Sequence, residues 1–574
     1  MTGAGGAGAA ELERLGDEYF AVVHSADPLT ATQLGVPGFD ALLPDPSRAG
    51  AAATARRLEA IEARLAAIDA GQLSAAGRTG HAVLAHLAAG ARGDLEHGLW
   101  ETNASADGYG SPAALVFQSV PHAPLTSPEA VADYLTRLRG LPAFFDAVTG
   151  RYRQALRDGR MSARVGVQQA IDQLGGYLRR DVLSDVLVSV ALPPSVDAAA
   201  VRDEAAVIVG GEIRPAMRRL LACLDTELLP VARPDGRVGI RFAPGGPEGY
   251  RAAVAKHTTT SLSPEEIHQI GLDTLAALAG EWAELGGRAL GVSEVPEILT
   301  RLRSDPALRF SSSAQIVATV TDALARAEAA RDDWFPRLDV PGCVIEEIDP
   351  VEAGNAPLAY YRPPGAGGLR PGAHCVLTAQ PGERFSYEYE ALAFHESSPG
   401  HHLQIATAQA LPGLPDYRRF LDAEVCGYVE GWGLYCERLA DEMGLYTSDL
   451  RRLGMLSFDA LRACRLVVDT GMHYYGWSRS EAIDFMWRNT ATTRANVTNE
   501  IDRYIAWPGQ ALSYLIGRRE IRRLRDWAAG ELGGRFDIRG FHGTVLGSGA
   551  VPLSVLDQLV SAWVTEQRAA QPGG

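Results

Sequence analysis

Four residues able to take part in metal chemistry lie within eight positions of the segment ALAFHESSPGHHLQ, residues 391–404. They are His395, Glu396, His401 and His402. In the zincin signature H-E-x-x-H, two histidines four positions apart bind zinc from one face of a helix, and the glutamate beside the first activates a water molecule. The segment therefore predicts a zinc site with Glu396 as the adjacent general base.

The spacing of the histidines leaves the second ligand open. This chain reads H-E-S-S-P-G-H-H, two residues longer than the usual signature. Six positions correspond to about 240° of rotation in an ideal helix, so His395 and His401 would not share a face of a straight helix. His395 and His402 nearly would, whereas a break at Pro399-Gly400 would let His401 reach the metal instead.

A third ligand is predicted in the segment EVCGYVEGWGLYCERL, residues 424–439. Glu430 and Glu437 are seven positions apart in a helical pattern and therefore lie on one face, two turns from each other. Glu430 is the predicted third ligand and completes a His-His-Glu site. Glu437 is predicted to orient a ligand through a hydrogen bond. The glycines at 427 and 431 suit close packing of this helix against another.

Most of the elements that must position these residues are predicted to be helices. Ser263, Pro264 and Glu266 form a capping-box start for a helix that should end at Gly286-Gly287. Ser312 and Gln315 offer a similar start for a helix ending near residues 334–336. The fold class is therefore mainly α.

Three short β-like runs between glycine and proline turns precede the His395 segment, at 343–348, 357–361 and 374–379. They predict a small antiparallel sheet beside the active-site helix. The Gly/Pro-rich segment 232–248 is the predicted linker between two lobes. The expected organisation is a disordered N-terminus at 1–10, a helical lobe at 11–245 and a catalytic lobe at 246–574. The alternative is that the two lobes form one continuous domain.

Composition narrows the classes of partner. The 574 residues carry a net charge of −16, which argues against nucleic acid or an anionic membrane as a partner, since both need a basic surface. No secretory signal and no run of 18 apolar residues is visible, so no membrane span is expected. The six cysteines are scattered and are expected to be reduced thiols. The expected location is the cytoplasm, and the expected state is a monomer or homodimer.

The chain resembles the bacterial family known as domain of unknown function 885. The hallmark segment H-E-x-x-P-G-H-H-x-Q is matched from His395 to Gln404. Similarity also covers DPLTATQLGVPGFD at 27–40, SPEEIHQIGL at 263–272, YVEGWGLYCERL at 428–439, RYIAWPGQALSYLIG at 503–517 and FHGTVLGSGAVPL at 541–553. The match therefore extends over nearly the whole chain.

This resemblance implies a relation to gluzincin zinc peptidases. The E-x₆-E spacing also resembles the third-ligand helix of Taq-type carboxypeptidases, which are mostly helical and two-lobed with a deep cleft. A two-lobed gluzincin-like fold is therefore expected. Together with the Pro399-Gly400 break, the resemblance favours His401 as the second zinc ligand and leaves His402 to contact the substrate.

The C-terminal third supplies further candidates for the chemistry. Tyr514 and His473 are predicted to donate hydrogen bonds to the oxyanion that forms during hydrolysis. Arg503 is predicted to bind a carboxylate of the substrate, because its planar guanidinium suits bidentate recognition.

The expected function is zinc-dependent hydrolysis of amide bonds in small peptides or peptide-like metabolites. A biosynthetic zinc enzyme acting on a non-peptide amide is one alternative. A degenerate zincin that only binds its ligand is another, although the intact Glu396 argues against it.

Overall fold

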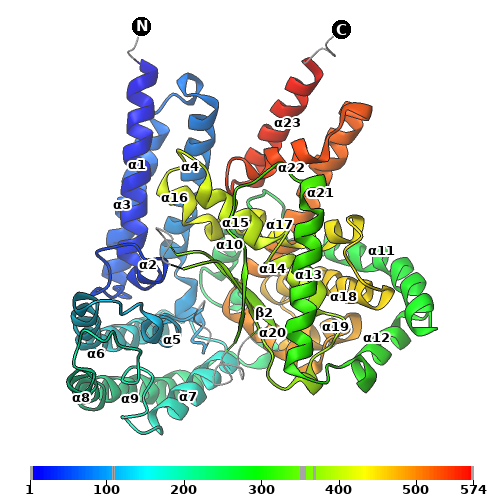
Figure 1. The fold of residues 1–574 in the computed structure, drawn as a ribbon. Coiled ribbons are helices and arrows are strands. Elements are labelled where there is room, and N and C mark those ends of the chain that lie inside the picture. The colour runs from blue at the N-terminus through cyan, green and yellow to red at the C-terminus, as the bar shows by residue number, and fades with distance from the viewer. Residues whose placement is uncertain (1–3, 107, 109, 349–356, 366–369, 570–574) are drawn as a thin grey trace.

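The computed structural model describes residues 4–106, 108, 110–348, 357–365 and 370–569. Within these ranges the protein is mainly helical, with one three-stranded sheet near its centre (Figure 1). Helix α1 begins at Ala4, so residues 4–10 belong to a helix and not to the disordered N-terminus that the sequence predicts. None of the described helices has the length and apolar character needed to cross a membrane.

The N-terminal helices form two groups. The first rises along one side of the molecule to the N-terminus (Figure 1) and comprises α1 (Ala4–Ala26), α2 (Pro28–Leu34), α3 (Arg48–Ala66) and α4 (Ala75–His97). The second lies below it and comprises α5 (Pro112–Ser119), α6 (Pro128–Arg157), α7 (Arg164–Leu178), α8 (Ala198–Ile208) and α9 (Arg214–Cys223).

The remaining helices surround the sheet. Those before or at the site are α10 (Gly246–Thr258), α11 (Pro264–Leu290), α12 (Val295–Ser304), α13 (Ser313–Trp334), α14 (Tyr389–Glu396), α15 (His401–Ala410), α16 (Asp416–Arg419) and α17 (Cys426–Glu442). Those after it are α18 (Asp449–Thr470), α19 (Arg479–Asn489), α20 (Arg494–Ala506), α21 (Ser513–Leu532), α22 (Ile538–Leu546) and α23 (Leu553–Ala569).

Two of the predicted helix starts are confirmed. Ser263 caps α11 in a capping box with Glu266, and Ser312 accepts a hydrogen bond from the backbone N–H of Gln315 at the start of α13. Helix α11 runs one turn past the predicted glycine pair and is capped by Gly291. The φ of this residue, 71°, lies in the left-handed region, which glycine adopts easily because it has no side chain.

The sheet contains the three predicted strands, β1 (Val344–Glu347), β2 (Ala359–Arg362) and β3 (Ala373–Val376). Its order is β1-β3-β2, with β3 antiparallel to β2 but parallel to β1. The predicted purely antiparallel sheet is therefore wrong. Because β3 lies between the two earlier strands, it pairs with both, parallel to β1 and antiparallel to β2.

Three large hydrophobic cores hold the helices together. One lies wholly within residues 29–232 and joins α5–α9. The largest joins residues 12–88 to helices near the C-terminus, including α15, α17 and α21–α23. The third packs α11 and α12 against α14, α18, α19 and α20. Within the predicted linker, Val238 and Ile240 are buried. The division into lobes at residue 245 and the gluzincin-like arrangement stay predictions.

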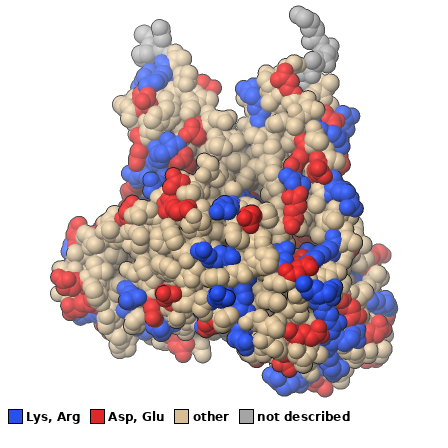
Figure 2. Space-filling view, turned by 180° about the vertical axis from the view of Figure 1, so that it is seen from behind, with Lys and Arg blue, Asp and Glu red and all other residues tan. Residues whose placement is uncertain are grey.

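The surface carries both signs of charge. The face in Figure 2 shows basic and acidic side chains interspersed over its lower part, with a notch between the two raised ends of the molecule. These ends hold the two chain termini in Figure 1.

Candidate metal centre

The histidine-rich segment forms two short helices, α14 and α15, with a break between them at Pro399-Gly400. Helix α14 ends at Glu396 and α15 begins at His401. Gly400 makes the turn possible, since a Cβ atom at this position would lie 1.9 Å from the carbonyl oxygen of His395. The turn brings the imidazole rings of His395 and His401 together, with their centroids 4.6 Å apart.

Glu430 of α17 completes a cluster of three donor groups. Its Oε2 lies 3.7 Å from Nε2 of His395 and 3.4 Å from Nε2 of His401. The three donor atoms all lie within 4.8 Å of one another, and this is the one such group of three or more His, Cys, Asp or Glu side chains in the part of the chain that the structure describes.

The separations suit a zinc ion. Bonds of about 2.1 Å from zinc to imidazole nitrogen and carboxylate oxygen, in tetrahedral geometry, hold neighbouring donor atoms about 3.4 Å apart. Two imidazoles and one carboxylate are also the donor set of many catalytic zinc sites, which keep the fourth position for water or substrate. His395, His401 and Glu430 could therefore hold this metal with little movement.

Gly433 makes room for the two imidazoles. It lies on α17, one turn from Glu430, and a Cβ atom there would come within 2.8 Å of Cε1 and Nε2 of His395 and 3.0 Å of Cε1 of His401. Any side chain at this position would push on both histidines at once.

The buried Glu437, which the sequence predicts to orient a metal ligand, contacts His395. Its Oε1 lies 2.8 Å from Nδ1 of His395, which leaves Nε2 to face Glu430. Burial acts to lower the pKa of His395, but Glu430 and Glu437 outweigh it and raise that pKa to about 9. Burial acts to raise the pKa of Glu430, but the two histidines lower it overall. The cluster is thus arranged to stabilise positive charge at its centre.

Glu396 lies beside this cluster at the end of α14. Burial raises the pKa of its carboxyl group above the ordinary value, while His395 and His401 pull the pKa in the opposite direction. The backbone N–H of Tyr361 on β2 donates a hydrogen bond to the carboxylate. A carboxylate with a raised pKa next to a possible metal site can accept and return a proton.

His402 points away from the cluster. Its Nδ1 lies 3.0 Å from the hydroxyl of Tyr361, and its Nε2 lies 2.8 Å from the carbonyl oxygen of Pro341. With both ring nitrogens engaged, His402 ties α15 to β2 and to the segment before β1. The predicted contact of His402 with the substrate is therefore corrected, because neither nitrogen is left for one.

Of the two predicted oxyanion donors, the structure brings only Tyr514 to the cluster. Its ring lies nearly parallel to that of His395, with centroids 6.3 Å apart. His473 is buried elsewhere: its Nδ1 accepts a hydrogen bond of 3.0 Å from the backbone N–H of Ile240, and its Nε2 lies 3.0 Å from the carbonyl oxygen of Tyr504. The prediction for His473 is therefore corrected, because both nitrogens already serve the packing of the surrounding chain.

Arg503 lies near Tyr514. Burial and Glu430 raise the pKa of that tyrosine, and the positive charges of Arg465 and Arg503 act against them. Two further arginines, Arg462 and Arg465 of α18, also lie against Tyr514, with their guanidinium carbons 5.7 Å and 4.3 Å from the ring centroid. The sequence reasoning missed this pair. The available signal was two arginines three positions apart in the otherwise apolar run ALRACRLVV.

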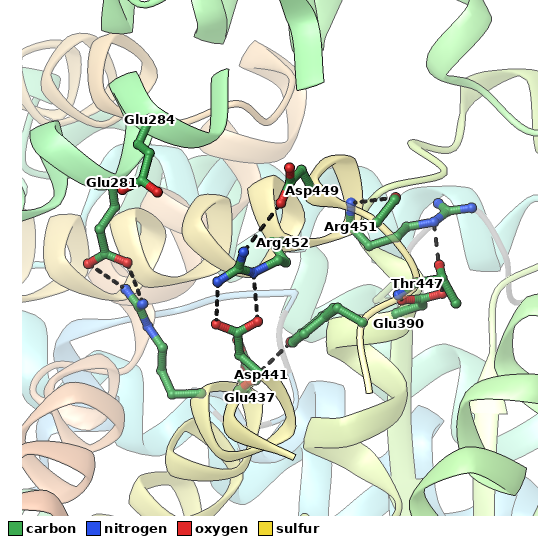
Figure 3. Close-up of polar contacts among 12 residues, drawn as sticks. Glu281, Glu284, Glu390, Glu437, Asp441, Thr447, Asp449, Arg451 and Arg452 are labelled. Atoms are coloured by element: carbon green, nitrogen blue, oxygen red, sulfur yellow. Dashed lines mark hydrogen bonds and ion pairs between the residues drawn. The ribbon is translucent and has the colours of Figure 1, made fainter. Parts of the chain in front are cut away.

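Ion pairs hold α17 in place behind the cluster. Arg452 of α18 binds both carboxylate oxygens of Asp441 at 2.7 Å and 2.9 Å and also contacts Asp449 (Figure 3). Arg438 of α17 pairs with Glu281 of α11 and with the buried Asp459 of α18. These contacts fix the helix that carries both Glu430 and Glu437.

Two solved structures share this fold over nearly the whole chain. One is described as "the putative lipoprotein from Colwellia psychrerythraea"; it is 26% identical, with a TM-score of 0.89, and 97% of this chain and 99% of that chain are covered. The other is described as "a putative lipoprotein of unknown function from Shewanella oneidensis", with 19% identity, a TM-score of 0.74, and 96% and 99% covered. At 19% identity the likeness shows the fold alone.

These descriptions correct the expected location. Lipoproteins are held at a membrane by an attached lipid and are not cytoplasmic, so the prediction of a cytoplasmic protein is contradicted by what the solved relatives are called.

The family is shown by a match over most of the sequence. No curated protein matches the chain. A family model described as "Bacterial protein of unknown function (DUF885)" matches residues 28–560, which include every residue of the candidate metal centre. The chain therefore belongs to the DUF885 family of bacterial proteins.

Proposed function

We propose that this protein is a zinc-dependent hydrolase that cleaves amide bonds in small peptides or peptide-like metabolites. The observation that carries the proposal is the convergence of His395, His401 and Glu430, with Glu396 beside them. A structural zinc site would have no use for a carboxylate of raised pKa next to an open coordination position.

The residues have separate roles in this proposal. His395, His401 and Glu430 hold the zinc, and Glu437 keeps Nε2 of His395 directed at it. Zinc held there would lower the pKa of water and polarise the scissile carbonyl. Glu396 takes a proton from the attacking water and gives it to the leaving amine. Tyr514 donates from its hydroxyl to the carbonyl oxygen as negative charge develops.

The sheet offers a place for an extended substrate. Among the described strands, β2 pairs with β3 alone, so it is an edge strand of the sheet. Tyr361 of β2 hydrogen-bonds to Glu396 through its backbone, so a peptide added along this edge would pass the proposed base. Such binding admits short extended chains and excludes folded proteins.

The first test separates metal binding from catalysis. Glu396→Gln should keep about one zinc per chain and lose hydrolysis by at least about 100-fold, because the amide cannot accept the proton. His395→Ala should lose the zinc itself. Elemental analysis and a peptide-library digest read by mass spectrometry measure both, with Glu59→Gln on the exposed face of α3 as the matched control.

Several results would contradict the proposal. Full zinc occupancy in His395→Ala would show that the metal lies elsewhere. Loss of zinc in Glu396→Gln would make this residue a ligand and not a base. Efficient cleavage of intact folded proteins would contradict a substrate bound along β2, and no cleavage of any peptide would remove the proposed activity.

A further inference from the structure

Three arginines beside the candidate metal centre have buried nitrogen atoms without hydrogen-bond partners. The side chains of Arg462 and Arg465 on α18 are 6% and 7% exposed, and that of Arg503 on α20 is 23% exposed. Among the described residues, no partner exists for Nε and Nη1 of Arg462, Nη1 of Arg465 or Nε of Arg503. Buried donors of a charged group are normally satisfied, so these nitrogens are available to an acceptor from outside the chain.

The carboxylates around them are too few to balance the charge. Glu500 is shared, with its Oε2 2.8 Å from Nη2 of Arg465 and 3.4 Å from Nη2 of Arg503. Arg462 has Glu437, at 3.5 Å, which already binds His395 more closely. Within ion-pair distance, three guanidiniums therefore face two carboxylates, both shared. Glu388 and Asp469 act on Arg462 and Arg503 only from farther away. In a poorly solvated environment this leaves a site that favours one more negative charge.

The arginines border the metal centre through a single aromatic ring. The guanidinium carbon of Arg465 lies 4.3 Å from the centroid of Tyr514, and the same ring lies 6.3 Å from that of His395. Arg462 reaches the other side of His395 through Glu437. Arg503 and Tyr514 are partly exposed, so a ligand can approach from solvent.

We propose that Arg465 and Arg462, together with Arg503, bind the free α-carboxylate of a peptide, and that the protein removes residues from peptide C-termini. The inference rests on the proposed function. Guanidinium groups match a carboxylate through paired N–H donors. Successive Cα atoms are about 3.8 Å apart, so a carboxylate held one aromatic ring away from His395 places a peptide bond close to the metal centre.

The test compares binding of two probes that differ only in this group. N-acetyl-dialanine and its C-terminal amide are titrated calorimetrically into the zinc-loaded Glu396→Gln protein, so that hydrolysis does not interfere. The acid should bind about 10- to 100-fold more tightly, as expected for charge-assisted hydrogen bonds. Arg465→Lys and the more exposed Arg503→Lys should each weaken acid binding by about 10-fold and leave amide binding unchanged, because lysine lacks the planar fork.

Arg214→Lys is the matched control. Arg214 is as deeply buried as Arg465 and pairs with Asp185 in the core of α5–α9, so its change tests for a general loss of packing. The ratio of acid to amide affinity should stay constant in this variant.

The outcomes separate the two proposals. The carboxylate site is overturned if the protein binds acid and amide equally well or binds neither. It is also overturned if the ratio of acid to amide affinity is unchanged in both lysine variants, or if inorganic phosphate binds more tightly than the acid. If the natural protein hydrolyses acid and amide peptides equally well, the proposed hydrolase activity is supported and the proposed carboxylate site is rejected. If the protein binds the acid more tightly but hydrolyses no peptide, the carboxylate site is supported and the hydrolase activity is rejected.

Discussion

At the scale of single residues, two adjacent histidines have different surroundings and should respond differently to replacement. His401 faces Glu430, whereas His402 is held by Tyr361 and Pro341. His401→Ala should lower zinc affinity by at least about 100-fold, because a ligand is removed. His402→Ala should bind zinc nearly as well and lose stability instead, by about 1–3 kcal/mol for the unsatisfied partners it leaves.

Zinc competition with a chromophoric chelator and urea denaturation of both variants check this prediction. A greater loss of zinc affinity in His402→Ala would reverse the ligand assignment.

Gly433 gives a second prediction at this scale, since it sets the distance between the two histidine ligands and α17. Gly433→Ala should reduce zinc affinity by about 10-fold or more, because the added Cβ would displace both imidazoles. Gly280→Ala on α11 is the matched control: it meets no atom within 4 Å and should stabilise its helix by about 0.5–1 kcal/mol. Unchanged zinc affinity in Gly433→Ala would mean that the histidines adjust freely, and the same chelator assay measures it.

The residues of the candidate site were largely predictable from the sequence, but their arrangement was not. The spacing of His395, Glu396 and Glu430 indicated a metal site, and the position of Glu437 indicated its contact with His395. Ideal helix geometry favours His402 over His401, but that geometry does not apply here, because the chain is not helical between Glu396 and His401.

Burial explains the other differences. An imidazole such as that of His473 can donate a hydrogen bond to an oxyanion, but tertiary packing directs both its ring nitrogens to the backbone. Arg462 and Arg465 lie in a sequence that looks like an ordinary buried helix. Their importance becomes visible only when Tyr514 and Glu500, distant in the chain, are placed beside them.

At the scale of elements, local sequence signals predicted the starts of helices correctly but not the directions in which strands pair. The cap residues of α11 and α13 act within one turn, so the sequence was sufficient for them. The direction in which β1 pairs with β3 depends on the path of the chain between them, which no local pattern records. For this reason the strands were predicted correctly and their sheet was not.

The crossing of α17 and α21 yields an element-scale prediction. Gly431 and Gly517 lie at the contact, and a Cβ atom on Gly517 would come within 1.8 Å of the carbonyl oxygen of Gly427. Gly517→Ala should therefore destabilise the protein by about 1–3 kcal/mol or more, because the helices must separate. Gly530→Ala, later on α21 with no atom within 4 Å, is the control and should be neutral or stabilising.

Urea denaturation of the two alanine variants measures this difference. Equal stability of Gly517→Ala and the unchanged protein would show that the two helices can part without cost. Since α17 carries Glu430 and Glu437, zinc affinity should fall together with stability.

At the scale of the whole molecule, a buried acid should make stability depend on pH. Asp469 of α18 accepts hydrogen bonds from the hydroxyl of Tyr250 on α10 and the backbone N–H of Gly509. Burial nevertheless raises the pKa of this carboxyl group to about 7. The unfolded group ionises near pH 4, so between about pH 4 and 7 the unfolded state binds fewer protons than the folded state. This group therefore lowers stability as pH rises through that window.

Asp469→Asn removes the ionisation. Its free energy of unfolding relative to the unchanged protein should rise between pH 5 and 7.5, by about 1.4 kcal/mol for each unit of pKa shift within the window. Urea denaturation at both values, with the exposed Asp203→Asn of α8 as control, gives the measurement. A difference independent of pH would show that Asp469 is already ionised in the folded protein at pH 5.

The largest core also has a consequence for synthesis. Residues 12–88 leave the ribosome well before residues 512–564, which supply part of the apolar surface that they must cover. Domains usually fold as they emerge, but these helices cannot finish packing until residues 512–564 have been made. Over that interval the nascent helices must keep apolar faces exposed, which makes them a natural client for chaperones and a target for proteases when translation stops early.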